Sequence, residues 1–273
     1  MSINKAILPI AGLGTRFLPI TKVIPKEMMP INGVPILQLL IEEAYEAGVR
    51  EIVLVVNREK ETIIREYLSR DGGTAGKVAA KGKDEKLDRL NRLINEVKFN
   101  FVYQDKQLGD GHALLQARES VGNEPFLVLF GDDLVIKSTP DAPNAAKQLI
   151  EAHKKTGSSV IALEEIDPEM SGSYGILKPA PDETGPLYKV EDLVEKPSPS
   201  DAPSNLGVIG KYICTPDIWI PLSEANASVG NEIRLIDGFK KLLSSKDLYG
   251  LKIEGKRYDT GTLEGYKKAV EEV

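Results

Sequence analysis

Residues 5–48 read KAILPIAGLGTRFLPITKVIPKEMMPINGVPILQLLIEEAYEAG and contain three different patterns in succession. Residues 5–10 form a short apolar run, which predicts a β-strand. The loop that follows is rich in proline, which restricts φ and removes backbone donors, so a continuous α-helix is excluded there. In residues 36–48 the apolar side chains recur with helical spacing, and Gly48 ends the pattern. A strand, a stiff loop and a helix in this order are typical of an α/β fold.

The alternation of strand and helix continues through about the first 165 residues. Further apolar, β-branched runs occur at residues 51–56, 99–103, 126–130 and 159–165, with amphipathic stretches between them. Strands that are apolar throughout, each followed by a helix, indicate a parallel sheet covered on both faces. Right-handed crossovers make such a sheet doubly wound and Rossmann-like, with ligands at the carboxyl ends of its strands.

The pattern changes after about residue 170. Strand-like pieces at residues 173–179, 186–197 and 205–216 are separated by Pro, Gly, Ser and Asp. They predict antiparallel strands that either extend the main sheet or form a subdomain over it. Residues 71–86 are rich in glycine and lysine and are expected to form a loop. We therefore predict a mostly parallel mixed sheet with a smaller antiparallel part, in a single domain over residues 1–273.

The composition excludes several classes of function. Of 273 residues, 41% are hydrophobic and 28% are charged, as in ordinary globular proteins, and the formal net charge is −6. A negative chain has no general affinity for nucleic acid or anionic membranes, so phosphate binding must depend on a few local cations. No apolar run approaches the ~18 residues of a membrane span, and the N-terminus lacks a signal-peptide pattern, so we expect no membrane partner.

Cysteine and histidine are scarce. The single cysteine, Cys214, lies in an apolar run and is expected in the core, and no internal disulfide is possible. A reducing compartment fits this usage, so we expect a cytoplasmic protein. The two histidines, His112 and His153, are far apart and lack matching cysteines, which argues against a zinc site of ordinary spacing.

The glycines of the opening loop invite comparison with dinucleotide-binding proteins. Gly12 and Gly14 follow the first strand, but Phe17 occupies the place of the third glycine, and no acidic residue ends the second strand. The lysine and hydroxyl residues of a P-loop are also missing. A dinucleotide oxidoreductase is therefore disfavoured. What remains is a glycine turn whose backbone amides can approach a ligand closely.

Charged side chains follow this glycine turn. Thr15 and Arg16 come directly after it, and the Arg16 guanidinium can bind two phosphate oxygens at once. Because proline reduces the freedom of the loop, Lys26 and Glu27 can be held in place before a ligand arrives. The alternative is a rigid surface loop that carries ordinary charges.

A second polar segment follows the predicted strand at residues 99–103. Gln104 stands at the strand end, and a turn at Gly109 and Gly111 leads into a helix. A glutamine amide both donates and accepts hydrogen bonds, as reading the edge of a nucleobase requires. His112 at the start of the helix can pack or cap, or it can transfer a proton.

Acidic residues follow two other predicted strands. The run FLVLFGDDLVI places Asp132 and Asp133 at the carboxyl end of a central strand. Paired carboxylates suit Mg²⁺, which takes hard oxygen ligands and completes its octahedron with phosphates and water; a polar turn or helix cap is the alternative. Asp259 precedes a helix that Thr260 or Thr262 could cap. Asp259 can share a metal with Asp132 only if the two meet in space.

Glu195 and Lys196 end another predicted strand, beside a proline in the motif LVEKP. A carboxylate suits paired sugar hydroxyls, and an ammonium group suits a phosphate as a point charge. A solvated strand edge is the alternative for this pair.

Eight motifs, taken in order, resemble those of the sugar-1-phosphate nucleotidyltransferases over nearly the whole chain. They are AGLGTRFLPITKVIPKEMMPINGVPILQ, LGDGHALLQAR, FGDDLV, SYGIL, LVEKP, APSNLGVIGKYICTP, GNEIRLID and RYDTGTLEGY. KEM, VEKP and APSNLGVIG favour the uridylyl branch over the thymidylyl and N-acetylglucosamine branches. Leu108, Asp110 and Ile236 depart from the pattern of the uridylyl branch, so a thymidylyltransferase or another member of the family is the alternative.

The resemblance implies an activity and its cofactor. The expected reaction transfers a uridylyl group from UTP to α-D-glucose 1-phosphate, giving UDP-glucose and pyrophosphate, with Mg²⁺. Residues 1–165 would form the nucleotide-binding half, and residues 166–273 the sugar-binding half with the C-terminal helices. A homo-oligomer, either a dimer or a tetramer, is expected. Regulatory homologues with weak catalysis lose the Thr-Arg of the loop, whereas Thr15 and Arg16 are present here, which favours an active enzyme.

The resemblance also implies roles for individual residues. Those expected at the nucleotide are Ala11, Gly12, Gly14, Thr15, Glu27, Gln104 and Gly109. Arg16 would bind the departing pyrophosphate, and Lys26 would contact the phosphates. Those expected at the sugar phosphate are Gly175 and Glu195, on the hydroxyls, and Lys196, on the phosphate. Asp132 would bind magnesium with Asp259 as the second ligand, and the expected catalytic residues are Arg16, Lys26, Asp132 and Lys196.

Overall fold

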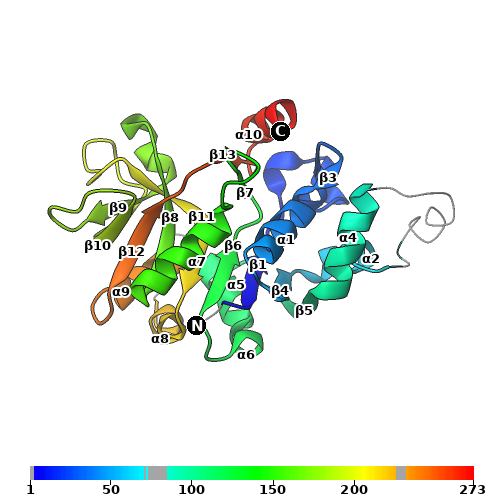
Figure 1. The fold of residues 1–273 in the computed structure, drawn as a ribbon, viewed down its shortest axis with the longest axis horizontal. Coiled ribbons are helices and arrows are strands. Elements are labelled where there is room, and N and C mark those ends of the chain that lie inside the picture. Colours follow the sequence, from blue (N-terminus) through cyan, green and yellow to red (C-terminus); the bar gives the residue numbers. More distant parts are fainter. Residues whose placement is uncertain (1–2, 71, 73–84, 226–231) are drawn as a thin grey trace.

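The computed structural model describes residues 3–70, 72, 85–225 and 232–273 (Figure 1). Most of the glycine- and lysine-rich loop expected at residues 71–86 therefore lies outside the described residues, as do the first two residues of the GNEIRLID motif. Within the described ranges, no helix is long and apolar enough to cross a membrane.

The first half of the chain forms one side of a nine-stranded sheet. Its parallel strands are β1 (Lys5–Pro9), β4 (Glu51–Val56), β5 (Lys98–Tyr103) and β6 (Phe126–Leu129), in the order β5-β4-β1-β6. The connecting helices are α1 (Ile36–Glu46), α2 (Arg58–Tyr67), α4 (Glu85–Glu96), α5 (Asp110–Gln116) and α6 (Arg118–Val121). The predicted α/β fold with a mixed sheet is confirmed, and these four strands are its mostly parallel part.

The second half continues the same sheet. After helix α7 (Ala145–Thr156) come the strands β8 (Ser159–Glu165), β9 (Gly175–Pro179), β10 (Leu187–Glu195), β11 (Leu206–Cys214) and β12 (Leu248–Lys252). Strand β11 runs antiparallel between β6 and β8, and the order ends β8-β12-β10-β9. β9 and β10 are antiparallel, whereas β12 is parallel to β8. The later strands therefore extend the sheet and do not form a separate subdomain.

Smaller elements complete the chain. The opening loop winds through the 3₁₀ turns η1 (Thr15–Phe17), η2 (Ile20–Lys22) and η3 (Lys26–Met28) to the hairpin of β2 (Pro30–Ile31) and β3 (Val34–Pro35). β7 (Asp133–Ile136) pairs with β13 (Lys256–Asp259) apart from the main sheet. The remaining turns and helices are η4 (Pro168–Ser173), η5 (Pro216–Ile218), α8 (Trp219–Ser223), α9 (Leu235–Leu242) and α10 (Leu263–Glu272).

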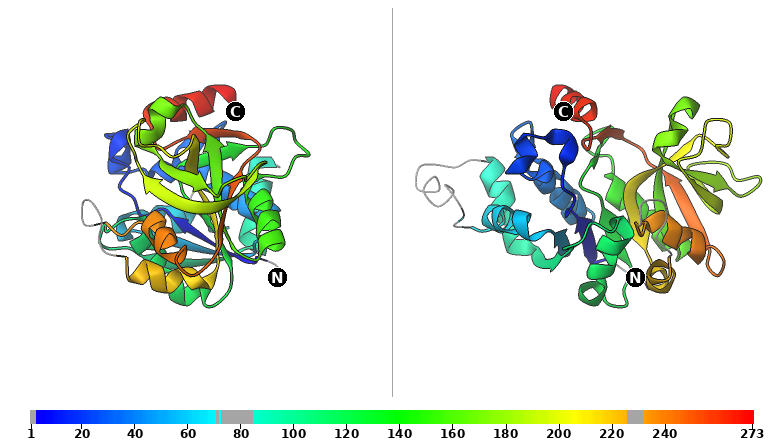
Figure 2. Two further views of the ribbon diagram at one scale, coloured as in Figure 1. Left: turned by 90° about the vertical axis from the view of Figure 1, so that its left-hand side faces the viewer. Right: turned by 180° about the vertical axis from the view of Figure 1, so that it is seen from behind.

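Two hydrophobic layers hold helices against opposite faces of the sheet. In β1, Leu8 belongs to the layer that includes α1 and α7, and Ile7 belongs to the layer that includes α5 and α9. This division follows from the alternation of side chains along a strand. Cys214 is fully buried, as predicted. From behind, the N-terminal elements and the later strands β9, β10 and β12 lie on opposite sides, with α10 near the junction (Figure 2).

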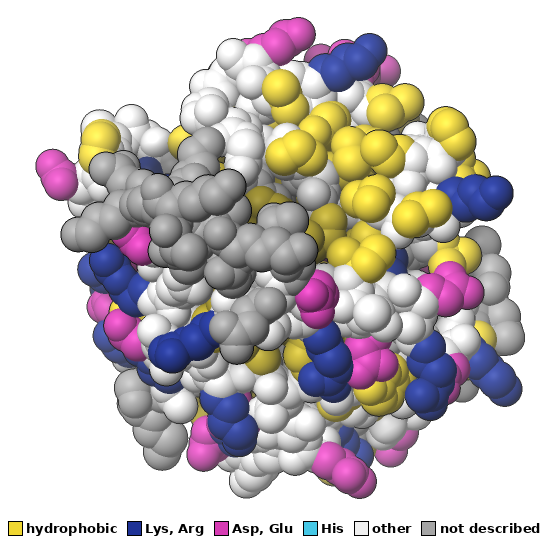
Figure 3. Space-filling view, turned by 90° about the vertical axis from the view of Figure 1, so that its right-hand side faces the viewer, with side chains coloured by type: hydrophobic (Ala, Val, Ile, Leu, Met, Phe, Trp, Pro, Cys, Tyr) yellow, Lys and Arg dark blue, Asp and Glu magenta, His cyan; other side chains and the backbone are white. Residues whose placement is uncertain are grey.

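The opening loop is not fully covered by the rest of the chain. It exposes Leu13, Leu18, Ile20 and Val23. Figure 3 shows hydrophobic side chains gathered in the upper right part of the view, on the side of the molecule where the opening loop lies. A contiguous exposed patch of this kind is typical of surfaces that contact another molecule.

A buried ion pair and one hydrogen bond connect strand β11 with helices α1 and α7. Lys211 of β11 is fully buried, and its Nζ lies 2.7 Å from Oε2 of Glu43 on α1. The other oxygen, Oε1, accepts a hydrogen bond from the backbone N of Ala146, at the start of α7 (3.1 Å). Because both charges are out of water, removing one partner leaves the other uncompensated.

We expect Lys211→Met to lower the free energy of unfolding by about 3–5 kcal/mol, since it leaves the Glu43 carboxylate buried without its cation. Urea denaturation measures the loss. The double substitution Lys211→Met with Glu43→Leu should recover most of it, whereas Lys252→Met, which removes an exposed pair with Glu165, should change little. Equal losses in the single and double variants would contradict this account.

Candidate active site

The carboxyl ends of the parallel strands β1, β4, β5 and β6 lie at one edge of the sheet. The opening loop leaves β1 at this edge, and Asn57, Gln104 and Gly131 follow the other three strands. Polar segments that are far apart in sequence therefore converge there, as doubly wound sheets require of a ligand site.

In the glycine turn of the opening loop, a side chain would be crowded at Gly14 but not at Gly12. Gly14 has φ +66°, and a Cβ there would lie 3.1 Å from Cγ2 of Thr21. The Thr21 hydroxyl donates to the Gly14 carbonyl at 2.8 Å, which closes the turn. A Cβ at Gly12 would meet nothing within 4 Å, so a ligand can approach the backbone there. Thr15 begins the short η1 turn that follows.

Lys26 and Asp132 form the central ion pair of the site, with 2.9 Å between Nζ and Oδ2. Burial disfavours both charges, but each group stabilises the other. The net result is a pKa of Asp132 below its usual range and a pKa of Lys26 above its usual range. Both groups are therefore charged at neutral pH, as a site for anions and a metal requires.

Asp259, from near the C-terminus, lies close to Asp132. Pairing of β13 with β7 brings them together, and Thr260 N donates to the Asp132 carbonyl at 2.8 Å. The two carboxylates flank Gly261, where a Cβ would lie 2.8 Å from Asp132 Oδ2 and 3.1 Å from Asp259 Oδ1. The sequence left open whether Asp132 and Asp259 lie close together, and in the structure they do. Thr262, not Asp259, caps α10 with its side chain.

This donor set fits magnesium. Mg²⁺ is usually held by one or two carboxylates together with substrate phosphates and water. Asp132 and Asp259 would supply those carboxylates, and any side chain at position 261 would crowd both of them. Within the described residues, no group of three or more His, Cys, Asp or Glu side chains converges into a complete metal cage. The Mg²⁺ ion would therefore need the substrate to complete its coordination.

Arg16 reaches the same place from the opening loop. Its Nη1 lies 3.4 Å from the carbonyl oxygen of Gly261, and the side chain is otherwise exposed. Arg16, Lys26, Asp132 and Asp259 thus surround one small region at the end of β6 and β13, although they come from the beginning, the middle and the end of the chain.

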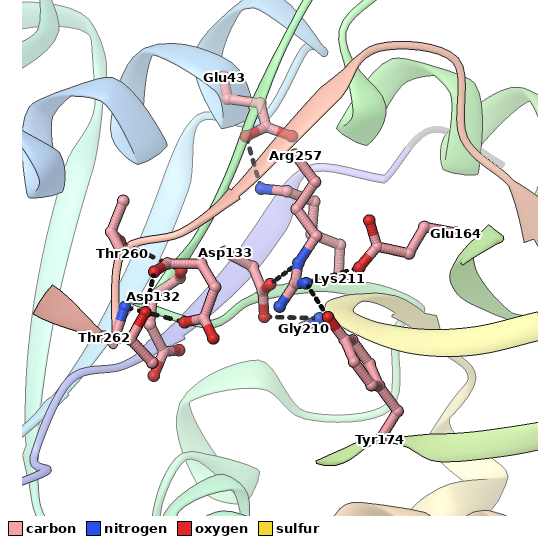
Figure 4. Close-up of polar contacts among 12 residues, drawn as sticks. Glu43, Asp132, Asp133, Glu164, Tyr174, Gly210, Lys211, Arg257, Thr260 and Thr262 are labelled. Carbon is pink, nitrogen blue, oxygen red and sulfur yellow. Dashed lines mark hydrogen bonds and ion pairs between the residues drawn. The ribbon is translucent and has the colours of Figure 1, made fainter. Parts of the chain in front are cut away.

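Asp133 points away from Asp132 into the protein (Figure 4). Its Oδ2 accepts from Gly210 N at 2.8 Å, and its Oδ1 pairs with Arg257. Burial raises the pKa of Asp133 in spite of the opposing charge of Arg257. Arg257 also reaches Glu164 at 2.6 Å and the Tyr174 hydroxyl at 3.0 Å. The sequence suggested no role for Arg257, because an arginine on a short strand is ordinarily a surface residue.

The side chain of Gln104 is fixed over the start of α5. Its amide donates to the Gly109 carbonyl at 2.8 Å and lies 3.1 Å from Nδ1 of His112. Burial lowers the pKa of His112, so the ring is neutral at pH 7. These contacts agree with the packing role for His112, which is one of the two that the sequence allowed. The Ala11 carbonyl nearby accepts from Asn57 Nδ2 at 3.0 Å.

Glu27 does not lie with the exposed members of the site. It is fully buried, and its Oε2 lies 2.9 Å from Nζ of Lys60 on α2. Lys60 also donates to the Ile10 carbonyl at 3.0 Å, so the pair ties the η3 turn to the end of β1. The contact between Glu27 and a nucleotide that the resemblance implied stays a prediction. Lys60 was missed, because a lysine in a charged helix has no distinctive sequence signal.

The residues expected at the sugar phosphate meet at the ends of β9 and β10. Gly175 is paired with Glu195 in the strand register, and Lys196 N donates to the Tyr174 carbonyl at 2.9 Å. Lys196 has φ +47°, which turns its exposed side chain beside Glu195, with 3.6 Å between Nζ and Oε1. Arg234 Nη1 lies 2.9 Å from the same Oε1 and was also missed by the sequence analysis.

Known proteins are similar to this chain in sequence and fold. The family model described as nucleotidyl transferase matches residues 5–273. The chain is 41% identical over 266 residues to UTP–glucose-1-phosphate uridylyltransferase 2 of Staphylococcus saprophyticus, covering 97% of this chain and 90% of that one. It is 40% identical over 264 residues to UTP–glucose-1-phosphate uridylyltransferase of Bacillus subtilis, covering 97% and 88%.

Solved structures with a similar fold point to the same family. A UDP-glucose pyrophosphorylase complexed with UDP-glucose has a TM-score of 0.89 at 39% identity, covering 98% of this chain and 97% of that one. A UTP-bound relative from Acinetobacter baumannii has a TM-score of 0.88 at 33% identity, covering 98% and 92%. The resemblance inferred from the motifs is confirmed: the chain belongs to the nucleotidyl transferase family.

Proposed function

We propose that the protein transfers a uridylyl group from UTP to α-D-glucose 1-phosphate, giving UDP-glucose and pyrophosphate. The observation that carries this proposal is the convergence of Arg16, Lys26, Asp132 and Asp259 around Gly261, at the carboxyl edge of the parallel strands. The names of the relatives at about 40% identity over 97% of the chain support the choice of UTP and glucose 1-phosphate.

The substrates are assigned to the two sides of this convergence. The nucleotide would lie along Ala11, Gly12, Gly14 and Thr15, with its base at Gln104 and Gly109. The sugar 1-phosphate would lie at Gly175, Glu195 and Lys196, at the ends of β9 and β10. The α-phosphate would then stand between the two sides, near Lys26 and Asp132. The division into a nucleotide-binding half before residue 166 and a sugar-binding half after it is part of this proposal.

The chemistry requires little acid–base assistance. A phosphate oxygen of glucose 1-phosphate attacks the α-phosphorus of UTP, a new P–O bond forms, and the bond from that phosphorus to the bridging oxygen of pyrophosphate breaks. The attacking oxygen is already anionic at neutral pH, so no general base is needed. The main obstacle is repulsion between two anions, which Arg16, Lys26 and Lys196 would offset while aligning the oxygens.

A magnesium ion would be held by Asp132 and Asp259. When bound, Mg²⁺ supplies positive charge that offsets the charge on the phosphate oxygens. Asp132 is ionised and already paired with Lys26, so the protein keeps a carboxylate ready at this point. With Asp132 bound to the metal, Lys26 would be available to the phosphates.

Two further expectations remain proposals. A homo-oligomer, either a dimer or a tetramer, is supported by the exposed hydrophobic side chains Leu18, Ile20 and Val23 of the opening loop, which offer a surface for a second copy. A cytoplasmic location is supported by cysteine usage, because the single cysteine, Cys214, allows no internal disulfide.

The substrate preference can be tested directly. We expect pyrophosphate release to be fastest with UTP and glucose 1-phosphate when the common NTPs and dTTP are each combined with glucose, galactose and N-acetylglucosamine 1-phosphates. A preference for dTTP would assign the protein to the thymidylyl branch. Absence of turnover with every pair would support a regulatory homologue.

We expect Asp132→Asn to lower kcat by at least ~100-fold at saturating Mg²⁺, the scale of losing one strong electrostatic element of a site. Steady-state pyrophosphate release measures the loss. Asp141→Asn, on an exposed loop, is the matched control and should retain full activity. Near-wild-type turnover of the Asp132 variant would show that this carboxylate does not hold the metal.

We expect Arg16→Ala to reduce kcat/KM for UTP by at least ~10-fold, because a charge-assisted contact to phosphate is lost. The melting temperature should hardly change, since Arg16 is exposed. Arg118→Ala, an exposed arginine on α6, controls for the loss of a surface cation. A large fall in the melting temperature would instead assign Arg16 a structural role in the loop.

A further inference from the structure

The two carboxylate oxygens of Glu195 have different surroundings. Oε1 accepts from Nη1 of Arg234 at 2.9 Å. Oε2 faces Gly175, where a Cβ would lie only 3.3 Å from it and 2.5 Å from Cδ1 of Ile236. Only glycine leaves room beside Oε2, and the Glu195 side chain is partly exposed there. One oxygen is thus held by a guanidinium, while the other has no hydrogen-bond donor among the residues that the structure describes.

Arg234 is itself held rigidly from both sides. The segment 233–235, here termed the strap, crosses the turn at residues 108–111. Ile233 N donates to the Leu108 carbonyl at 2.8 Å, and Gly111 N donates to the Ile233 carbonyl at 2.9 Å. On the other side of Arg234, Leu235 N donates to Oδ1 of Asp110 at 2.8 Å. The backbone on both sides of Arg234 is therefore fixed to the turn.

The same turn contacts the side chain that is expected to read the base. Gln104 donates to the Gly109 carbonyl at 2.8 Å, and a Cβ at Gly109 would lie 2.4 Å from the Ile233 carbonyl oxygen. The turn and the strap are thus in direct backbone contact. Hydrogen bonds and one ion pair connect Gln104, the turn, the strap, Arg234 and Glu195 without interruption.

We propose that Arg234 is a positioning residue for the sugar: by holding Oε1 of Glu195 from the strap, it presents Oε2 to hydroxyl groups of the sugar 1-phosphate and so sets the discrimination among sugars. This inference rests on the proposed function. It assigns a role to Arg234 and also to Asp110, which holds the strap through Leu235 N. Asp110 is one of the positions at which the chain departs from the uridylyl pattern.

The physical reason lies in orientation and charge. A free glutamate side chain loses conformational freedom when it binds a ligand, and an arginine that fixes it beforehand removes part of that cost. The planar guanidinium fixes a carboxylate oxygen more strictly than an ammonium group does. Arg234 also lies 3.7 Å from Glu232 and offsets the negative charges of Glu195 and Asp110.

The test compares wild type with Arg234→Gln, which removes the charge and shortens the side chain but keeps a hydrogen-bonding amide. We expect KM for glucose 1-phosphate to rise by about 10- to 100-fold, the scale of a lost charged hydrogen bond, while KM for UTP stays within about twofold. The wild type should discriminate against 2-, 3- or 4-deoxyglucose 1-phosphate, and the variant should lose most of the discrimination against at least one of them. A structural role for Arg234 alone would not produce this loss.

Matched variants complete the test. Lys178→Gln removes an exposed ion pair with Glu191 from the same two strands and should leave both KM values unchanged. Arg234→Lys should restore part of the sugar affinity, and Glu195→Gln combined with Arg234→Gln should cost little more than either alone. Additive effects, or unchanged deoxysugar discrimination in a folded Arg234→Gln protein, would overturn the inference. If the wild type itself makes no UDP-glucose, the proposed function fails instead.

Discussion

The site depends on one long-range pairing, between the short strands β7 and β13. These strands lie outside the main sheet, and Arg257 on β13 is paired with Asp133 on β7 although the two are 124 positions apart. The pairing brings Asp259 and Gly261 to the end of β6, where Asp132 stands. Without it, neither the shared carboxylate site nor the contact between Arg16 and Gly261 would exist, because Arg16, Asp132 and Asp259 come from distant parts of the chain.

The adjacent carboxylates Asp132 and Asp133 show how neighbouring residues acquire different roles. Asp132 faces the open edge of the sheet and is kept ionised by Lys26, whereas Asp133 faces inward and is engaged by Arg257 and Gly210 N. Their pKa values shift in opposite directions for this reason. One aspartate is available to a metal and phosphates, and the other holds together the pairing that positions the first.

The two halves of the chain are joined through the sheet as well as through the site. β11 is inserted between β6 and β8, and its Lys211 reaches Glu43 on α1 through the buried ion pair. At the edge, the strap of residues 233–235 connects the turn at Gly109 to Glu195. Backbone contacts therefore connect the proposed nucleotide side of the site to the proposed sugar side.

Much of this followed from the sequence. The alternation of apolar strands and amphipathic helices predicted the doubly wound sheet, and the ordered motifs identified the family, because periodicity and motif spacing are local properties of a chain. The tertiary structure alone decided that β11 enters the sheet, that Asp259 meets Asp132, that Glu27 is buried against Lys60, and that Arg257 and Arg234 support the site. These outcomes depend on which distant segments pack together, and a charged residue has the same local pattern whether it faces water, a ligand or a buried partner.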